Sequence, residues 1–353
     1  MSIIKDPEYL PVFHHIAKNA GTYVLSWAQM LCRRYHILRG DNLKCGIECD
    51  SDIFYSHWTS GKVRRALIKL KDNRQLTIIY CTLTDLTGSD QGVFSLPQAQ
   101  KINLTDSNVG QKILKLQMEY INNRYPNDSD ETTNIIPEDD FLNFIENGDI
   151  IPFCVIVDPI FWGGLKPKDN SSEWKCARIL IDLILSLSQR KHLLNFTVLR
   201  NPYDRALSIF NYIKSDNSSH EPNHACLVSK NFQEYIESDE LEDSWFLRSL
   251  MNMSDSAIIE PYHLTLAHEG YLKHFRISDI SKVDDLINNV FHGAYGILQS
   301  DVEDHIVKSN LHRNATTNKL KIKFEDLDPK IQQKFLDRTY WDRKLWERYC
   351  KNV

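Results

Sequence analysis

The stretch NFTVLRNPYDRALSIFNYIK, residues 195–214, joins an apolar run to a polar turn and then to a helical pattern. Residues 195–200 contain the aromatic and β-branched side chains that are typical of a strand. Asn201 is a residue type that caps helices and Pro202 suits a first helical turn, so we expect a helix from Pro202 to about Lys214. The apolar side chains at helical spacing, which form its predicted buried face, are Tyr203, Ala206, Leu207 and Phe210. A strand followed at once by a helix is typical of parallel α/β sheets.

A second strand–turn–helix unit is predicted near the N-terminus. The sequence PVFHHI at 11–16 indicates a short strand, AKNAGT at 17–22 a turn, and the residues from 22 to about 35 an amphipathic helix. The apolar positions of that helix are Val24, Trp27, Ala28 and Leu31.

Other segments complete the expected architecture. Strands are predicted at 53–57, 78–82 and 150–157, and helices at 173–190 and 329–349. This order favours the α/β class, with a parallel sheet flanked by helices and a helical C-terminal part. We expect residues 1–353 to form a single domain, in which 85–172 is a long insertion of unknown role and 121–134 a mobile loop.

Composition excludes several function classes. The 42 Lys and Arg residues are outnumbered by 47 Asp and Glu residues, so no overall basic field exists to hold nucleic acid. No run of about 18 apolar residues predicts a membrane span. The eight cysteines form no CxxC pair and are expected to be reduced thiols, and no zinc site or other metal site is predicted.

Two segments have the chemistry of an anion site. A strand that runs into a loop with Lys18, Gly21 and Thr22, and then into a helix, offers a charge, a close backbone approach, a hydroxyl donor and a helix N-terminus. Arg200 follows a strand at the edge where α/β sheets bind ligands, and Ser208 lies two turns into the next helix. Taken singly, the first segment could equally be an ordinary connection, and Arg200 could simply pair with a surface carboxylate.

Together, HIAKNAGT at 15–22 and VLRNPYDRALSIFNY at 198–212 resemble motifs of the sulfotransferase superfamily that uses 3′-phosphoadenylyl sulfate (PAPS). The similarity is to its carbohydrate branch (uronyl 2-O-like, Golgi-type) and the bacterial and viral relatives of that branch. The resemblance implies a P-loop-like sheet and a set of donor contacts. Lys18, Asn19, Ala20, Gly21 and Thr22 would hold the 5′-phosphosulfate, and Arg200 and Ser208 the 3′-phosphate.

Two further segments extend the resemblance. LHRNATTNK at 311–319 is similar to a late basic loop, so Arg313, Thr317 and Lys319 would contact the donor. FYSHWTSG at 54–61 is similar to the segment that carries the general base, which would be His57. The chain departs from the family pattern at Ala17, which replaces Pro, at Ala20, which replaces Gly, and at Asn201, which replaces Asp.

The implied reaction is in-line transfer of the sulfuryl group to a hydroxyl, with a saccharide as the expected acceptor and 3′,5′-ADP as the product. His57 would take the hydroxyl proton, since an imidazole is largely neutral at pH 7, and Lys18 would stabilise the leaving phosphate. His14 and His15 are rival bases, but their place within a strand favours packing. No metal is required, and the lack of an apparent signal peptide or anchor leads us to expect a cytoplasmic protein.

Two other functions stay open on the sequence alone. A P-loop kinase or NTPase shares the anion-loop chemistry, with Asp158 as its candidate magnesium ligand, but Lys18 precedes Gly21 instead of following it as in GxxxxGK[ST]. A catalytically inactive nucleotide- or glycan-binding protein would also keep the loop. The identity of the acceptor and the role of 85–172 are not readable from the residues.

Overall fold

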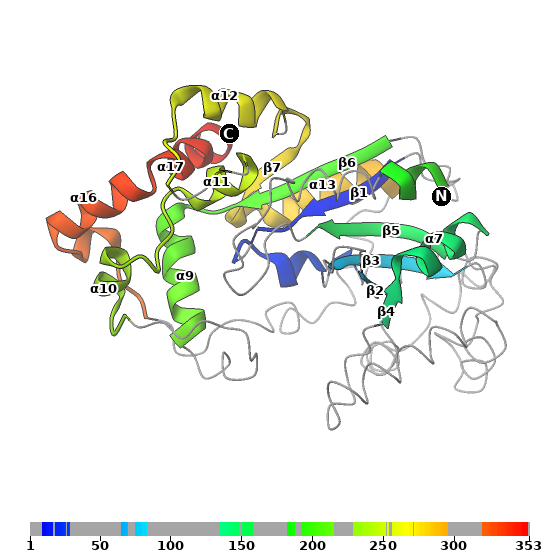
Figure 1. Cartoon of the computed structure of the whole chain (residues 1–353), viewed down its shortest axis with the longest axis horizontal. Coiled ribbons are helices and arrows are strands. Elements are labelled where there is room, and N and C mark those ends of the chain that lie inside the picture. The colour runs from blue at the N-terminus through cyan, green and yellow to red at the C-terminus, as the bar shows by residue number, and fades with distance from the viewer. Residues whose placement is uncertain are drawn as a thin grey trace.

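The structure is a computed structural model of the chain. It describes residues 9–16, 18–25, 27–28, 65–69, 75–82, 134–147, 150–157, 182–187, 192–214, 229–251, 253, 256–270, 272–295 and 320–351. In these residues seven strands form one sheet in the order β4-β2-β3-β5-β1-β6-β7 (Figure 1). The strands are β1 (Tyr9–His14), β2 (Arg65–Lys69), β3 (Gln75–Thr82), β4 (Asn134–Pro137), β5 (Ile150–Val157), β6 (His192–Leu199) and β7 (Arg276–Asp279).

The sheet is mixed, with mostly parallel strands. The strand pairs β1–β5, β1–β6, β6–β7 and β2–β4 are parallel, whereas β3 is antiparallel to both β2 and β5. The predicted α/β class is therefore confirmed, but the prediction of a wholly parallel sheet is wrong at β3. Lys69 of β2 pairs with Gln75 of β3, and a connection that short joins antiparallel strands only, because a parallel crossover needs a dozen or more residues.

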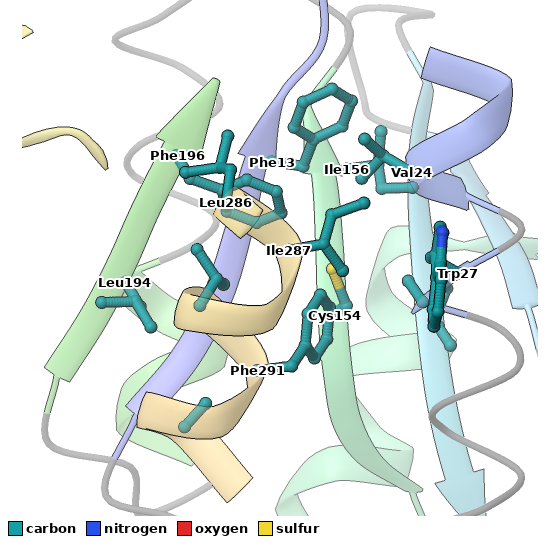
Figure 2. Packing of buried hydrophobic residues seen from close by; sticks show 14 of the residues in the cluster. Phe13, Val24, Trp27, Cys154, Ile156, Leu194, Phe196, Leu286, Ile287 and Phe291 are labelled. Atoms are coloured by element: carbon teal, nitrogen blue, oxygen red, sulfur yellow. The ribbon is translucent and has the colours of Figure 1, made fainter. Parts of the chain in front are cut away.

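Helices cover both faces of the sheet. On one face α13 (Val283–Tyr295) and the helical residues 21–25 and 27–28 enclose a core that includes Phe13, Trp27 and Phe291 (Figure 2). On the other face α7 (Glu138–Glu146) and the helical residues 182–187 pack on Leu10 and Val12. Neighbouring residues of β1 thus face opposite layers, as the period of two in a strand requires. The central strands are buried from both sides.

The deciding stretch folds as predicted. The helix α9 spans Pro202–Lys214, and the Asn201 Oδ1 atom accepts a hydrogen bond of 2.9 Å from the backbone N–H of Tyr203, which makes Asn201 the expected cap. The predicted inner-face side chains are Tyr203, Ala206 and Phe210, which are buried, and Leu207, which is partly buried. The predicted strand at 150–157 has the bounds of β5, and the strands predicted at 11–16 and 78–82 overlap β1 and β3.

The segment 85–172 is not simply an insertion beside the sheet. Its described residues form β4, α7 and β5, and β5 lies between β3 and β1 near the centre of the sheet. The strand pairing therefore makes these described residues part of the main sheet. The other residues of 85–172, including nearly all of the predicted mobile loop 121–134, lie outside the described part of the chain.

The C-terminal part is mostly helical, as expected, and most of its helices lie together beyond β6 and α9 (Figure 1). The helices here are α10 (Phe232–Glu237), α11 (Trp245–Met251), α12 (Pro261–Gly270), α16 (Pro329–Arg338) and α17 (Tyr340–Trp346), with short turns at Leu272–His274, Ile280–Lys282, Phe324–Asp326 and Glu347–Lys351. The single helix predicted at 329–349 is wrong, because it is divided at Thr339. No helix in the described ranges has both the length and the hydrophobicity to cross a membrane.

Candidate functional site

The two segments predicted to bind an anion lie next to each other at one edge of the sheet. β1 and β6 are parallel neighbours, so the loops that follow them leave at the same edge. The side-chain Nδ2 of Asn19 donates a hydrogen bond to the carbonyl oxygen of Val198 at 2.9 Å. Arg200 Nη1 donates to the carbonyl oxygen of Lys18 at 3.4 Å. The tertiary fold therefore brings both segments into direct contact.

The loop after β1 has an uncommon backbone conformation. Lys18 and Ala20 have φ angles of 65° and 62°, in the left-handed region that favours glycine. The N–H of Asn19 donates to Ile16 O at 3.0 Å, and the N–H of Val24 donates to Ala20 O at 3.0 Å as the helix begins. Two left-handed non-glycine residues so close together are strained, and such strain is typical of ligand-binding loops. Ala20 holds this strain at the position where the resembling family has glycine.

Gly21 is required by a neighbouring side chain. It begins a helix and does not have a left-handed φ, so another residue could adopt its backbone conformation. A Cβ atom added to Gly21, however, would lie 2.0 Å from His15 Nε2. The N–H of His15 donates to Val157 O at 2.8 Å, and its ring centroid lies 5.9 Å from that of Phe13. The imidazole of His15 therefore packs directly on the start of the loop helix.

The preceding histidine, His14, lies in the sheet. The Nε2 atom of His14 forms a hydrogen bond of 2.9 Å with Asn195 Oδ1, and its ring centroid is 4.4 Å from that of Phe275. His14 is buried, which agrees with the predicted packing role. The hydroxyl of Thr197 donates to the His14 carbonyl at 2.7 Å. His14 thus joins β1 to β6, whereas His15 contacts the loop.

Asn19 is the most deeply buried polar group of the loop. Its exposed fraction is 2%, and its Nδ2 is bound to Val198 O. Its side-chain Oδ1 has no hydrogen-bond partner among the described residues. An unpaired buried acceptor is costly, so this oxygen is suited to accept a hydrogen bond from a ligand or an ordered water.

Arg200 is partly buried and lies near the carboxylates of Asp204 and Asp279. Burial lowers the pKa of its guanidinium, while the charges of Asp204 and Asp279 act in the opposite direction. Asp279 ends β7 opposite Leu199, and its carboxylate accepts hydrogen bonds from Trp346 Nε1 at 2.7 Å and from the Ser281 N–H at 2.9 Å.

The carboxylate of Asp279 is stabilised in its charged form. Partial burial alone would raise its pKa, but the hydrogen bonds from Ser281 and Trp346, together with the Arg200 charge, leave the pKa lowered. Asp279 is therefore a fixed negative charge that neighbours Arg200. An anion bound at Arg200 would share that guanidinium with this existing charge.

The second and third turns of the helix α9 form part of the candidate site. Ser208 and Tyr212 are one turn apart and so share a face of the helix. The Lys18 ammonium lies over the Tyr212 ring, with Nζ 3.7 Å from the ring centroid. The charge from the loop after β1 is therefore held beside the helix that carries Ser208.

Arg205, on the same helix, points elsewhere. Its guanidinium carbon lies 3.9 Å from the Trp245 ring centroid, and burial lowers its pKa, while the charge of Asp342 acts to raise it. The Asp342 carboxylate accepts hydrogen bonds from the backbone N–H groups of Phe246 at 3.0 Å and Leu247 at 2.9 Å. Arg205 is thus part of the packing between α9, α11 and α17.

The segment that follows the predicted basic loop 311–319 is fixed to α9. Asn211 Nδ2 donates to Leu320 O at 3.0 Å, and the N–H of Leu320 donates to Asn211 Oδ1 at 2.9 Å. The hydroxyl of Tyr203 donates to Ile322 O at 3.1 Å. The chain just after the third predicted donor segment is therefore held against the helix of the second.

The structure thus describes the predicted site residues of the first two segments. Lys18, Asn19, Ala20, Gly21 and Thr22 form one loop and helix start. The Lys18 carbonyl accepts a hydrogen bond from Arg200, and the Lys18 ammonium contacts the Tyr212 ring, one turn after Ser208 on α9. The predicted base His57, the kinase-type ligand Asp158 and the three basic-loop residues lie outside the described part of the chain. These outlying residues of the third segment are Arg313, Thr317 and Lys319.

Three features of the site were not predicted. They are the packing of His15 on Gly21, the position of Tyr212 beside Lys18, and the charge of Asp279 near Arg200. Tyr212 could have been found from its spacing of four residues after Ser208 on a helical pattern. Asp279 ends a four-residue strand, RISD, that has no clear period. No family model, no curated protein and no solved structure matches this chain significantly, so its function must be argued from this geometry and from the motif resemblance.

Proposed function

We propose that this protein is a sulfotransferase that moves the sulfuryl group of PAPS to a hydroxyl, with a saccharide as acceptor. One observation carries the proposal: the two segments that would bind opposite ends of the donor are in contact. The contacts are those of Asn19 with the Val198 carbonyl and of Arg200 with the Lys18 carbonyl. Had the two loops opened at different edges of the sheet, one donor could not reach both.

The donor-binding roles follow from charge and position. The Lys18 ammonium, the Thr22 hydroxyl and the start of the helix at Gly21 form a positive environment for the 5′-phosphosulfate. Arg200 and Ser208 would bind the 3′-phosphate, with Arg200 giving charge-assisted hydrogen bonds. Two hydrogen bonds hold the backbone of Leu320, just after the basic loop, against Asn211 of α9. They support a position near the same donor for Arg313, Thr317 and Lys319.

The arrangement of the sheet supports a P-loop-like site. β1 lies between β5 and β6, and its carboxyl end continues through the strained loop into a helix. In open α/β sheets, ligands bind outside the carboxyl ends of the strands, where the connections diverge. After β1 the chain enters the helical residues 21–25, which pack on the face of the sheet that α13 covers. After β6 it enters α9.

The proposed mechanism needs one base and one electrostatic catalyst. His57 takes the proton of the acceptor hydroxyl as its oxygen forms a bond to sulfur. The bond between sulfur and the bridging oxygen breaks, and the electron pair leaves with the 5′-phosphate of 3′,5′-ADP. Lys18 and the helix start stabilise the negative charge that grows on that phosphate. Positioning and preorganised charge are sufficient for such a transfer.

Binding tests the donor assignment directly. We expect 3′,5′-ADP to bind without magnesium in isothermal titration calorimetry, and Arg200→Ala to weaken it about 10- to 100-fold, the loss typical of one charge-assisted contact. Arg276→Ala is the matched control, because Arg276 starts β7 and donates to the Asn289 carbonyl away from the site. Equal affinities of the two variants would contradict the proposal, and a preference for magnesium ATP would favour a kinase.

Transfer tests the reaction. Labelled sulfate from PAPS should appear on a member of a panel of mono- and oligosaccharides, and His57→Ala should lower turnover about 100-fold or more with little change in donor affinity. Full turnover of His57→Ala would refute the base assignment. Tight 3′,5′-ADP binding with no transfer to saccharides, lipids or phenols would favour an inactive binding protein instead.

A further inference from the structure

We infer that Tyr212 is a positioning residue for Lys18: its aromatic face holds the lysine ammonium between the loop after β1 and the helix α9. The inference rests on the proposed function only in naming PAPS as the anion that Lys18 meets. The carrying contact is the 3.7 Å distance from Lys18 Nζ to the Tyr212 ring centroid. Cation–π attraction acts within about 6 Å of the centroid, so this contact is close.

The backbone of Lys18 is fixed, and the ring of Tyr212 contacts the charged end of its side chain. The left-handed φ of 65° and the hydrogen bond from Arg200 to the Lys18 carbonyl hold the main chain. A lysine carries its charge on a flexible four-carbon stem with many rotamers. The ring of Tyr212 selects rotamers that direct the ammonium towards α9, where Ser208 lies one turn earlier.

Tyr212 is itself well held. It belongs to α9 and follows Asn211, whose side chain makes two hydrogen bonds with the backbone of Leu320. Phe210, two residues earlier, is buried in the core between α9, α10 and α16. The ring therefore projects from a rigid element, which a positioning residue requires.

Tyr212 does not occupy the aromatic position of the motif that this segment resembles. That motif has its aromatic residue two positions after the serine, and here this position is Phe210. Phe210 is 4% exposed and packs on Phe232, with ring centroids 5.5 Å apart. The aromatic residue of the motif therefore serves the core, and the contact with Lys18 comes from a different residue.

The test compares Tyr212→Phe, which keeps an aromatic face, with Tyr212→Leu, which removes it. The probes are 3′,5′-ADP and inorganic pyrophosphate, measured by calorimetry, and kcat/KM for sulfate transfer. We expect Tyr212→Phe to stay within about twofold of wild type and Tyr212→Leu to lose about 5- to 30-fold, the range for a partly desolvated cation–π pair. Tyr262→Leu is the control, because Tyr262 is 53% exposed on the remote helix α12.

A double variant separates positioning from general damage. In a Lys18→Ala background, Tyr212→Leu should cause no further loss, because the ammonium it positions is gone. Additive losses, or a Tyr212→Leu protein that binds both probes like wild type, would overturn the inference. If Tyr212→Leu unfolds, Tyr212→Met replaces it in the same comparison.

The probes also keep the two proposals apart. Coupling between Tyr212 and Lys18 in pyrophosphate binding, without any binding of 3′,5′-ADP, would support the positioning role and refute the donor assignment. Binding of 3′,5′-ADP that depends on Lys18 but not on the ring would do the reverse. Failure to bind either anion would overturn both.

Discussion

Gly21→Ala is expected to destabilise the protein because of one contact. The new methyl carbon would lie 2.0 Å from Nε2, 2.3 Å from Cδ2 and 2.7 Å from Cε1 of His15, against an ordinary contact distance of 3.4–4 Å. The ring must therefore move by roughly 1.4 Å or the loop must shift. Both responses disturb the anchored segment between β1 and the loop helix, because the His15 N–H is bound to Val157 O.

The expected magnitude combines two opposing effects. Overpacking of this kind costs about 1–3 kcal/mol of unfolding free energy. The backbone of Gly21 is already helical, so alanine would gain up to about 1 kcal/mol of helix propensity. The net loss is thus about 0–3 kcal/mol. Once His15→Ala has removed the ring, only the gain remains, and the coupling energy of the pair should be about 1–3 kcal/mol.

Urea unfolding of the wild type, both single variants and the double variant measures this coupling. Gly270→Ala serves as the control: nothing lies within 4 Å of the added Cβ at the end of α12, so a gain of up to about 1 kcal/mol from helix propensity and no coupling to His15→Ala are expected. A coupling energy below about 0.5 kcal/mol would refute the reasoning, since independent sites add within that margin. The same result would mean that Gly21 is not required by His15.

Three further changes test the local structure. Ala20→Gly should raise the urea midpoint, because relief of a left-handed alanine, about 1–2 kcal/mol, exceeds the chain entropy of glycine; a lower midpoint would contradict this strain. Asn201→Ala should cost about 0.5–2 kcal/mol through loss of the cap, and Asn201→Asp should restore it in the same assay. Because folding lowers the pKa of Asp279, its carboxylate contributes stability that is complete above an unfolded pKa of about 4 and is lost as pH falls through the lower folded value. The difference in unfolding free energy between wild type and Asp279→Asn should therefore be larger at pH 7 than at pH 2.5, and a constant difference would argue against the shift.

The parts of the fold that could be predicted are those with strong local signals. The pair Asn201–Pro202 marks a helix start whatever surrounds it, and α9 has the predicted bounds. The continuous apolar run of β5 likewise gave correct limits. The strand β2, RALIK, is short and has charged ends, and it pairs with both β3 and β4. Such pairing has no local signature.

The division of the C-terminal helix shows why periodicity alone was insufficient. The apolar pattern continues across Thr339, so the sequence favours one helix. In the fold, the Arg338 carbonyl accepts hydrogen bonds from Ser244, from its N–H at 2.8 Å and its hydroxyl at 3.0 Å. A carbonyl used in this way is diverted from the helical ladder, and the next helix starts with the bond from the Arg343 N–H to Thr339 O. The partner, Ser244, is far away in the sequence.

The candidate site likewise has features that could be predicted from the sequence and features that could not. The residue types of the loop from Lys18 to Thr22 and of Arg200 were chosen from chemistry and spacing, and the fold brings these two segments together. The contact of His15 with Gly21 lies within the first segment, across its turn, and the contact of Lys18 with Tyr212 joins the first segment to the second. Helical spacing places Tyr212 on the same face as Ser208, but only the tertiary structure could reveal the two contacts themselves.

The packing of Arg205 has a practical consequence for anyone who shortens this chain. Asp342 lies close to the C-terminal end, yet it supplies countercharge to an arginine of the helix that carries Ser208, and its oxygens cap α11. Trimming the last helix to ease crystallisation would leave that buried guanidinium without this countercharge and would remove the acceptor of the Phe246 and Leu247 N–H groups. The final residues therefore belong to any fragment intended for ligand soaking or activity screening, and an affinity tag is safer as a cleavable extension than as a replacement for them.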